Sequence, residues 1–164
     1  MPVNVYPVTL QGVDFETTET TAKFPVLSGC LDSWGGHWKY VQANGAITIY
    51  AVVKVDNDGQ ATALTTAISG VEPTQVGIAQ VAFADNDYGW VFVGPGAGTG
   101  SGIKVNNLVA CAADVKLYTA TAGNVDDTAT DLIAGLTLVT ANVSGGTTST
   151  ECFAATTLAT NCQD

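Results

Sequence analysis

The stretch VGIAQVAFADNDYGWVFV, residues 76–93, decides the fold predicted for this chain. It begins with an apolar run of strand length, from Val76 to Ala84, and continues into the polar sequence ADNDYG. Asp and Asn favour turns because their side chains bond to the nearby backbone and tolerate left-handed conformations. The apolar segment from Trp90 to Val93 follows and would be the returning strand. Two apolar runs joined by such a polar segment predict a β-hairpin.

The same pattern repeats along the chain. The segment HWKYVQANGAITIYAVVKV, residues 37–55, alternates at first and then becomes densely β-branched, and the turn sequence DNDG follows it. Turn sequences recur roughly every 8 to 15 residues, which is typical of sandwiches and barrels. Long amphipathic helical patterns are missing, which disfavours alternating strands and helices. We therefore predict an all-β fold, a compact antiparallel β-sandwich or barrel.

The first 36 residues differ in pattern from the rest. Pro2, Pro7 and Pro25 interrupt short apolar runs, and the segment DFETTETTA is polar and rich in Thr. Proline cannot donate a ladder hydrogen bond, so such a segment favours an extended arm or edge strands with little core of its own. We predict an extended N-terminal arm over residues 1–36, and a β domain with a C-terminal tail over residues 37–164.

The charge composition excludes one class of partner. The chain of 164 residues holds 15 acidic residues against 5 lysines and no arginine, and its formal net charge is -10. Phosphate backbones are bound by clustered Lys and Arg, whereas these lysines are spread singly, so we expect no nucleic-acid partner. No apolar run approaches the roughly 18 residues that span a bilayer, and no leader-like segment is visible. We expect no membrane partner and synthesis in the cytoplasm.

The glycine-rich segment GPGAGTGSG, residues 94–102, resembles a nucleotide-binding loop in composition only. Its glycines lack the G-x-G-x-x-G spacing, and no helix is predicted after it. A phosphate-binding loop also needs Gly-Lys followed by Ser or Thr, whereas Lys104 follows Ile103. We interpret the segment as a loop between strands, with a contact loop on a neighbouring subunit as the alternative. No cofactor is expected.

Neither a catalytic residue nor a metal site is predicted. Cys30 and His37 offer a thiol and a base, but the surrounding sequence has no signature of an orienting group or an oxyanion pocket. Turn chemistry explains the acidic pairs. These pairs lack the spacing of a calcium-binding loop: Asp56 with Asp58, Asp85 with Asp87, and Asp126 with Asp127. We therefore expect no enzyme activity.

The four cysteines are widely and irregularly spaced along the chain: Cys30, Cys111, Cys152 and Cys162. No C-x-x-C pair is present, and with a single histidine the chain has no recognisable zinc spacing. Buried free thiols are one interpretation. The other is a disulfide between Cys152 and Cys162, which would close a C-terminal loop in an oxidising medium.

Three segments together resemble a known family. They are WKYVQANGAITIYAVVKVDNDGQATALTTA, VGIAQVAFADNDYGWVFVGPG and CAADVKLYTATAGNVDD. In order and spacing they are similar to the small decoration, or cement, proteins of tailed-bacteriophage capsids. The resemblance covers roughly residues 38–143. It leaves out the first 36 or so residues and the tail TECFAATTLATNCQD.

The resemblance implies a structural part with no enzymatic activity. Such a protein binds the outer surface of a phage head and stabilises contacts between capsomers of an HK97-like major capsid protein. It also implies a homotrimer on the outer surface of the virion. A bridging oligomer adds buried area at the seams between capsomers, and many modest contacts act together. On this interpretation, deletion of residues 2–20 weakens binding to the particle and leaves the domain folded.

The candidate contacts with the capsid or another subunit are side chains near the arm and in the hairpin: Trp34, His37, Trp38, Tyr88 and Trp90. Aromatic side chains anchor many interfaces, although they also fill protein interiors. A virion-surface adhesin or a glycan-binding β module could use the same aromatics and is the alternative function. A hydrolase would require a role for His37 or Cys30.

Overall fold

The computed structural model describes residues 13–69, 75–96, 100–108, 110–128, 130–143 and 148–160. Over these ranges it contains 11 strands and one short helix. No helix in them is long and apolar enough to cross a bilayer. The elements in chain order are β1 (Gly29–Leu31), β2 (His37–Ala43), β3 (Val52–Val55), β4 (Gln60–Ala63), α1 (Thr66–Ser69), β5 (Gln75–Ala79), β6 (Tyr88–Phe92), β7 (Lys104–Asn107), β8 (Leu117–Thr119), β9 (Val125–Asp126), β10 (Leu132–Leu138) and β11 (Thr148–Thr160).

Five strands close into a barrel. The pairing runs from β2 to β4, β3, β5 and β6, and β6 pairs with β2 again. The pairing of β2 with β4 is parallel and the other four are antiparallel. The predicted all-β fold and the barrel are therefore confirmed. The predicted hairpin of residues 76–93 supplies β5 and β6, which pair through Ile78 and Phe92.

The inside of this barrel is filled by small side chains. Along each strand, alternate residues point inward, and the inward set forms a buried cluster dominated by Val and Ala. Val53 lies opposite Gly77, where an added Cβ would come within 2.8 Å of a methyl group of Val91. A five-strand barrel has a narrow interior because diameter grows with strand number. Ile47 and Phe83, which bridge each other, belong to the same cluster.

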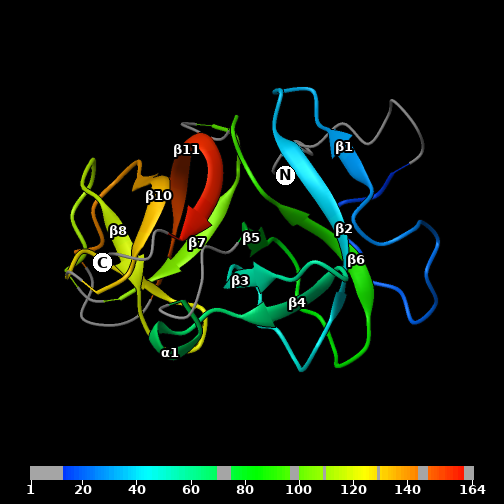
Figure 1. Ribbon diagram of the computed structural model, residues 1–164. Helices are drawn as coiled ribbons and strands as arrows, with labels where there is room; N and C mark the ends of the chain where they lie inside the picture. The colour runs from blue at the N-terminus through cyan, green and yellow to red at the C-terminus, as the bar shows by residue number, and fades with distance from the viewer. Residues whose placement is uncertain are drawn as a thin grey trace.

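The remaining strands form a second lobe. β11 pairs with β7 and β10, β10 with β8, β8 with β9, and β9 with β7, so these pairings also close a circuit. We call it the second circuit. Its link to the barrel is the pairing of β11 with β5, and Figure 1 shows the two lobes side by side. One core cluster runs through both: it includes Trp38 and Ile78 of the barrel and Leu117 and Leu136 of the second circuit.

The N-terminal segment packs on the outward-facing aromatic side chains of β2 and β6. The ring of Phe15 stacks on Trp38 with centroids 4.4 Å apart and meets Trp90 edge-on at 5.7 Å. The ring of Phe24 meets Trp90 and Tyr40 edge-on, with centroids 5.4 Å and 5.3 Å apart respectively. In Figure 1 this blue segment runs along the outside of β2 and β6.

Over residues 13–36 the N-terminal segment contains the edge strand β1 and few buried apolar side chains, as predicted, but those few are packed on the core of the barrel. Val13 and Phe15 are buried, and the backbone groups of Glu19 and Tyr88 exchange two hydrogen bonds, at 2.8 Å and 2.7 Å. The segment has few apolar residues, but Phe15 and Phe24 are placed against the outward-facing aromatic side chains of β2 and β6. Deletion of residues 2–20 would remove Phe15 from the Trp38 ring, so we expect it also to lower the stability of the domain. Residues 1–12 lie outside the described ranges.

We expect Phe15→Ala to lower the free energy of unfolding by about 3–5 kcal/mol, because it leaves a void against two tryptophan rings. Phe153→Ala is the matched control, since that ring is 47% exposed, and we expect a loss below about 1 kcal/mol. Urea unfolding followed by tryptophan fluorescence measures both. Equal losses in the two variants would show that residues 13–36 do not stabilise the fold.

We expect Gly77→Ala to destabilise the barrel by about 1–3 kcal/mol, because the new methyl group would collide with Val91 inside a filled interior. Gly29→Ala is the control: the nearest atom to its added Cβ, apart from its chain neighbours, lies 3.8 Å away. Thermal unfolding compares the two variants. A melting temperature of Gly77→Ala equal to that of Gly29→Ala would contradict the narrow interior.

Candidate functional site

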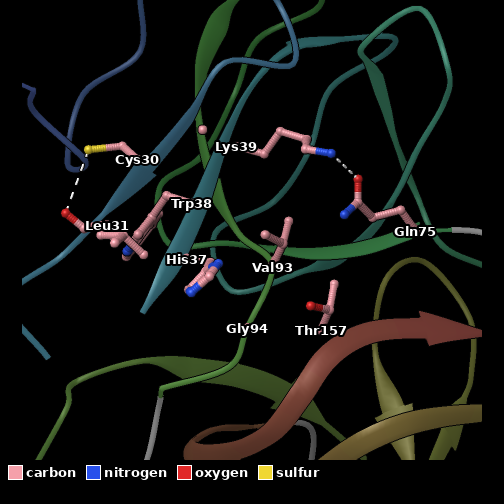
Figure 2. Close-up of a pocket in the computed structure, with 10 residues that line it drawn as sticks. Cys30, Leu31, His37, Trp38, Lys39, Gln75, Val93, Gly94 and Thr157 are labelled. Atoms are coloured by element: carbon pink, nitrogen blue, oxygen red, sulfur yellow. Dashed lines mark hydrogen bonds between the residues drawn. The ribbon is translucent and has the colours of Figure 1, made fainter. Parts of the chain in front are cut away.

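A pocket of about 560 Å³ opens at one end of the barrel. At this end the inward-facing side chains are Lys39 of β2 and Gln75 of β5, and Lys39 Nζ donates a hydrogen bond to Gln75 Oε1. Strands β2 and β5 do not pair with each other, so this bond spans the mouth of the barrel (Figure 2). The full lining is Gly29, Cys30, Leu31, His37, Trp38, Lys39, Gln75, Val93, Gly94 and Thr157.

The pocket is basic in a strongly acidic protein. Lys23 and Lys54 each form a salt bridge with an acidic side chain, whereas Lys39 bonds to a neutral amide and has no salt bridge among the described residues. His37 lies two residues earlier on β2 and is exposed. Residues two apart on a strand share a face. This arrangement leaves a lysine charge available for an anionic group of a partner.

A rigid turn beside the pocket presents Trp34 to solvent. Asp32 is buried, and its Oδ1 accepts hydrogen bonds from the backbone N–H groups of Trp34 (2.9 Å) and Gly36 (2.8 Å). Its Oδ2 accepts a third from Trp38 Nε1 (2.8 Å). The burial of the carboxylate is offset by these donors, which also fix the turn. The side chain of Trp34 is nevertheless 56% exposed.

Exposed apolar residues lie on β1 and in the segments just before and just after it. We name Val26, Leu27, Leu31 and Trp34 the contact surface; Leu31 is 51% exposed, and all four are among the most exposed large apolar side chains of the described chain. They flank or belong to β1, which pairs with β2 on one edge and, in the described ranges, with no strand on the other. Grouped exposed apolar side chains mark interaction surfaces.

The predicted contact residues separate into two groups. Trp34 and His37 are exposed, and Tyr88 is half-buried. Trp38 and Trp90 are only 1% and 3% exposed, so the prediction that they contact a partner is corrected. Their side chains point to the outer face of β2 and β6, where the N-terminal segment covers them. Trp38 also supports the turn that carries Trp34, since its Nε1 donates a hydrogen bond to Asp32 Oδ2.

The thiol of Cys30 and the imidazole of His37 do not form a pair. The ladder sets Cys30 opposite Trp38, and Leu31 opposite His37. Directly opposed residues point to one face of a sheet and sequence neighbours to opposite faces. Cys30 and His37 therefore project from opposite faces, and Figure 2 shows Cys30 pointing away from His37, with its Sγ donating a hydrogen bond to the Leu31 carbonyl (3.6 Å).

Burial raises the thiol pKa of each cysteine that the structure describes. Cys30, Cys111 and Cys152 are free thiols. Burial raises the pKa of Cys152 to about 12, and burial together with the carboxylates of Asp127 and Asp126 raises the pKa of Cys111 to about 11. Burial also raises the pKa of Cys30. Cys162 lies outside the described ranges, so the disulfide between Cys152 and Cys162 stays a prediction.

Sequence reasoning missed four of the residues that build this site. Leu31, Val26 and Leu27 were taken for part of a featureless arm, and Asp32 was given no role. The sequence DSWGG holds a usable signal, since Asp followed closely by glycines favours a side-chain-to-backbone turn. The glycine segment 94–102 connects β6 to β7, as predicted for a loop between strands; its residues 97–99 lie outside the described ranges.

Comparisons of the chain with protein-family models, with curated proteins and with solved structures find no match. The resemblance to phage decoration proteins therefore depends only on the residues given for it above.

At about pH 8 we expect a maleimide to modify Cys30 well before Cys111 and Cys152 in the native protein. The thiolate is the reactive form, and a raised pKa lowers the fraction of the thiol present as thiolate. Cys111 and Cys152 are in addition fully buried, so the reagent cannot reach them. Peptide mapping by mass spectrometry measures the modified fraction at each position, with the urea-unfolded protein as control. Equal rates at Cys30 and Cys152 in the native protein would contradict the buried position of Cys152.

Proposed function

We propose that this chain is a capsid decoration protein that binds the outer surface of a tailed-phage head and stabilises contacts between capsomers. Its partner is a major capsid protein of the HK97-like fold, and it acts as a homotrimer without enzymatic activity. The protein is made in the host cytoplasm and ends on the outside of the virion. The resemblance of residues 38–143 to the cement proteins motivates this assignment.

The observation that carries the proposal is the exposed Trp34 on the turn held by Asp32. Three hydrogen bonds fix this turn before any partner arrives, so little conformational entropy is lost on binding. Tryptophan is enriched among the residues that dominate binding energy. The neighbouring edge strand β1 adds Leu31 and two further apolar side chains, so the contact surface suits a protein partner.

The charges favour a partner with acidic groups at the pocket. Lys39 and His37 line it, and Lys39 has no carboxylate partner among the described residues. Elsewhere the net charge of -10 keeps the protein soluble and opposes non-specific association. Each copy needs only a modest interface, because a lattice presents many equivalent sites to an oligomer that bridges them.

We expect Trp34→Ala to weaken binding to undecorated capsids by about thirtyfold, the loss of roughly 2 kcal/mol typical of an interface anchor. Phe153→Ala, which removes another exposed ring from β11, is the matched control and keeps native occupancy. Both proteins are mixed with undecorated heads, and occupancy is measured by sedimentation and by imaging. Density between capsomers with the native chain, lost with Trp34→Ala, supports the proposal.

The outcome that contradicts the proposal is the absence of density on the capsid at saturating native protein. An exposed tryptophan beside a pocket that contains Lys39, Gln75 and His37 also suits stacking on a sugar ring, which favours an adhesin or a glycan-binding module as the second candidate. A glycan array probed with the native chain and with Trp34→Ala distinguishes the two. Binding to glycans without binding to heads would replace the first candidate by the second.

A further inference from the structure

A thiol and two carboxylates meet in the second circuit, away from the contact surface. Cys111 lies in the loop after β7, Asp126 ends β9, and Asp127 follows it. Their possible ligand atoms, Cys111 Sγ and one carboxylate oxygen from each aspartate, all lie within 4.8 Å of one another. Cys111 is buried, whereas both aspartates are partly exposed. The cluster thus combines a buried sulfur with two oxygens that solvent can reach.

The backbone holds both carboxylates in place. Asp127 Oδ2 accepts a hydrogen bond from the N–H of Ala112 (2.9 Å), the residue after Cys111, and Asp126 Oδ1 accepts one from the N–H of Asp127 (2.8 Å). Each carboxylate keeps its second oxygen without a hydrogen-bond partner in the described ranges. Hydrogen bonds of this kind orient carboxylates that ligate metals.

The negative charge of the cluster is not neutralised by the protein. Neither Asp126 nor Asp127 has a salt bridge among the described residues, where the two salt bridges join Lys23 to Glu19 and Lys54 to Asp56. Two adjacent carboxylates repel each other, and their partial burial leaves this repulsion less screened than it would be in bulk water. A divalent cation would remove this repulsion.

A buried oxygen without a partner lies on the neighbouring strand. Asn107 of β7 pairs with Val125, the residue before Asp126. Its Nδ2 donates to Thr150 Oγ1 and to the Val105 carbonyl, but its Oδ1 is buried with no hydrogen-bond partner in the described ranges. Such orphaned acceptors are rare in native proteins, so this part of the second circuit holds a polar group whose hydrogen bonding the described residues do not complete.

We propose that Cys111, Asp126 and Asp127 bind a divalent cation of borderline softness, with Zn²⁺ as the type and water as the fourth ligand. Thiolate sulfur selects Zn²⁺ over Ca²⁺ and Mg²⁺, which prefer oxygen alone. Bonds of about 2.3 Å to sulfur and about 2.0–2.2 Å to oxygen require only a small contraction of the present cluster. On binding, the Cys111 thiol releases its proton to solvent and the sulfur–metal bond forms, with no change of oxidation state.

The bound cation would have a structural role. β9 contains two residues and joins β7 through one residue pair, Asn107 with Val125. This is the weakest ladder of the second circuit. A metal that ties the loop after β7 to the end of β9 would reinforce the circuit at that point, so it would raise the melting temperature.

Cobalt titration of the full-length reduced chain tests the proposal. Co²⁺ replaces Zn²⁺ in such sites, and its thiolate charge-transfer absorption in the near ultraviolet reports a sulfur ligand directly. We expect this band to saturate at one equivalent and to disappear on addition of Zn²⁺. Cys111→Ser should abolish it, and Asp126→Asn combined with Asp127→Asn, which leaves the thiol in place, should weaken Co²⁺ binding by more than about tenfold.

Matched controls separate this site from the other thiols. Cys30→Ser and Cys162→Ser should leave the band and its affinity unchanged, and the near-ultraviolet circular dichroism of each variant without metal verifies its fold. The carboxylate double variant keeps the test valid where Cys111→Ser fails to fold. Absence of the band in the native chain, its persistence in Cys111→Ser, or its loss in Cys30→Ser or Cys162→Ser would each overturn the proposal.

Discussion

The fold depends on covering the aromatic side chains that β2 and β6 turn outward from the barrel. Trp38, Tyr40, Trp90 and Phe92 lie on that outer face, and exposed together they would form an apolar patch that a lone domain cannot keep in water. The N-terminal segment covers part of it with Phe15 and Phe24. The second circuit shares the same core and covers more. The barrel interior can therefore stay narrow, because the largest side chains pack outside it.

The sequence pattern predicts the strands better than it predicts their packing. The hairpin of residues 76–93 and the β-branched run of residues 37–55 both became barrel strands, because alternation and turn residues act locally. The closure of the barrel and the joining of the two lobes are set by pairings between residues far apart in sequence, such as Trp38 with Phe92 and Ala159 with Gln75. No local pattern identifies such partners.

The same limit explains which candidate contact residues are exposed and which are buried. Alternation along β2 indicates that Trp38 and Tyr40 share one face, but not that this face is covered by a ring more than twenty residues earlier. Trp34 stays exposed because Asp32 fixes the turn that carries it. This turn is local, since it spans only residues 32–36. The cluster of Cys111 with Asp126 and Asp127 was not predicted, since its members meet only when β9 packs beside β7.

The long strand β11 pairs with strands of both lobes and so joins them. Its first four residues pair with β7 and later residues, as far as Thr160, with β10, while Ala159 also pairs with Gln75 of the barrel. The Leu158 N–H donates a hydrogen bond to the Val93 carbonyl (2.9 Å). A force that pulls one lobe from the other must shear these bonds and open the common core at once. The two lobes therefore resist separation together, because a pull on either one loads the same hydrogen bonds and the same core.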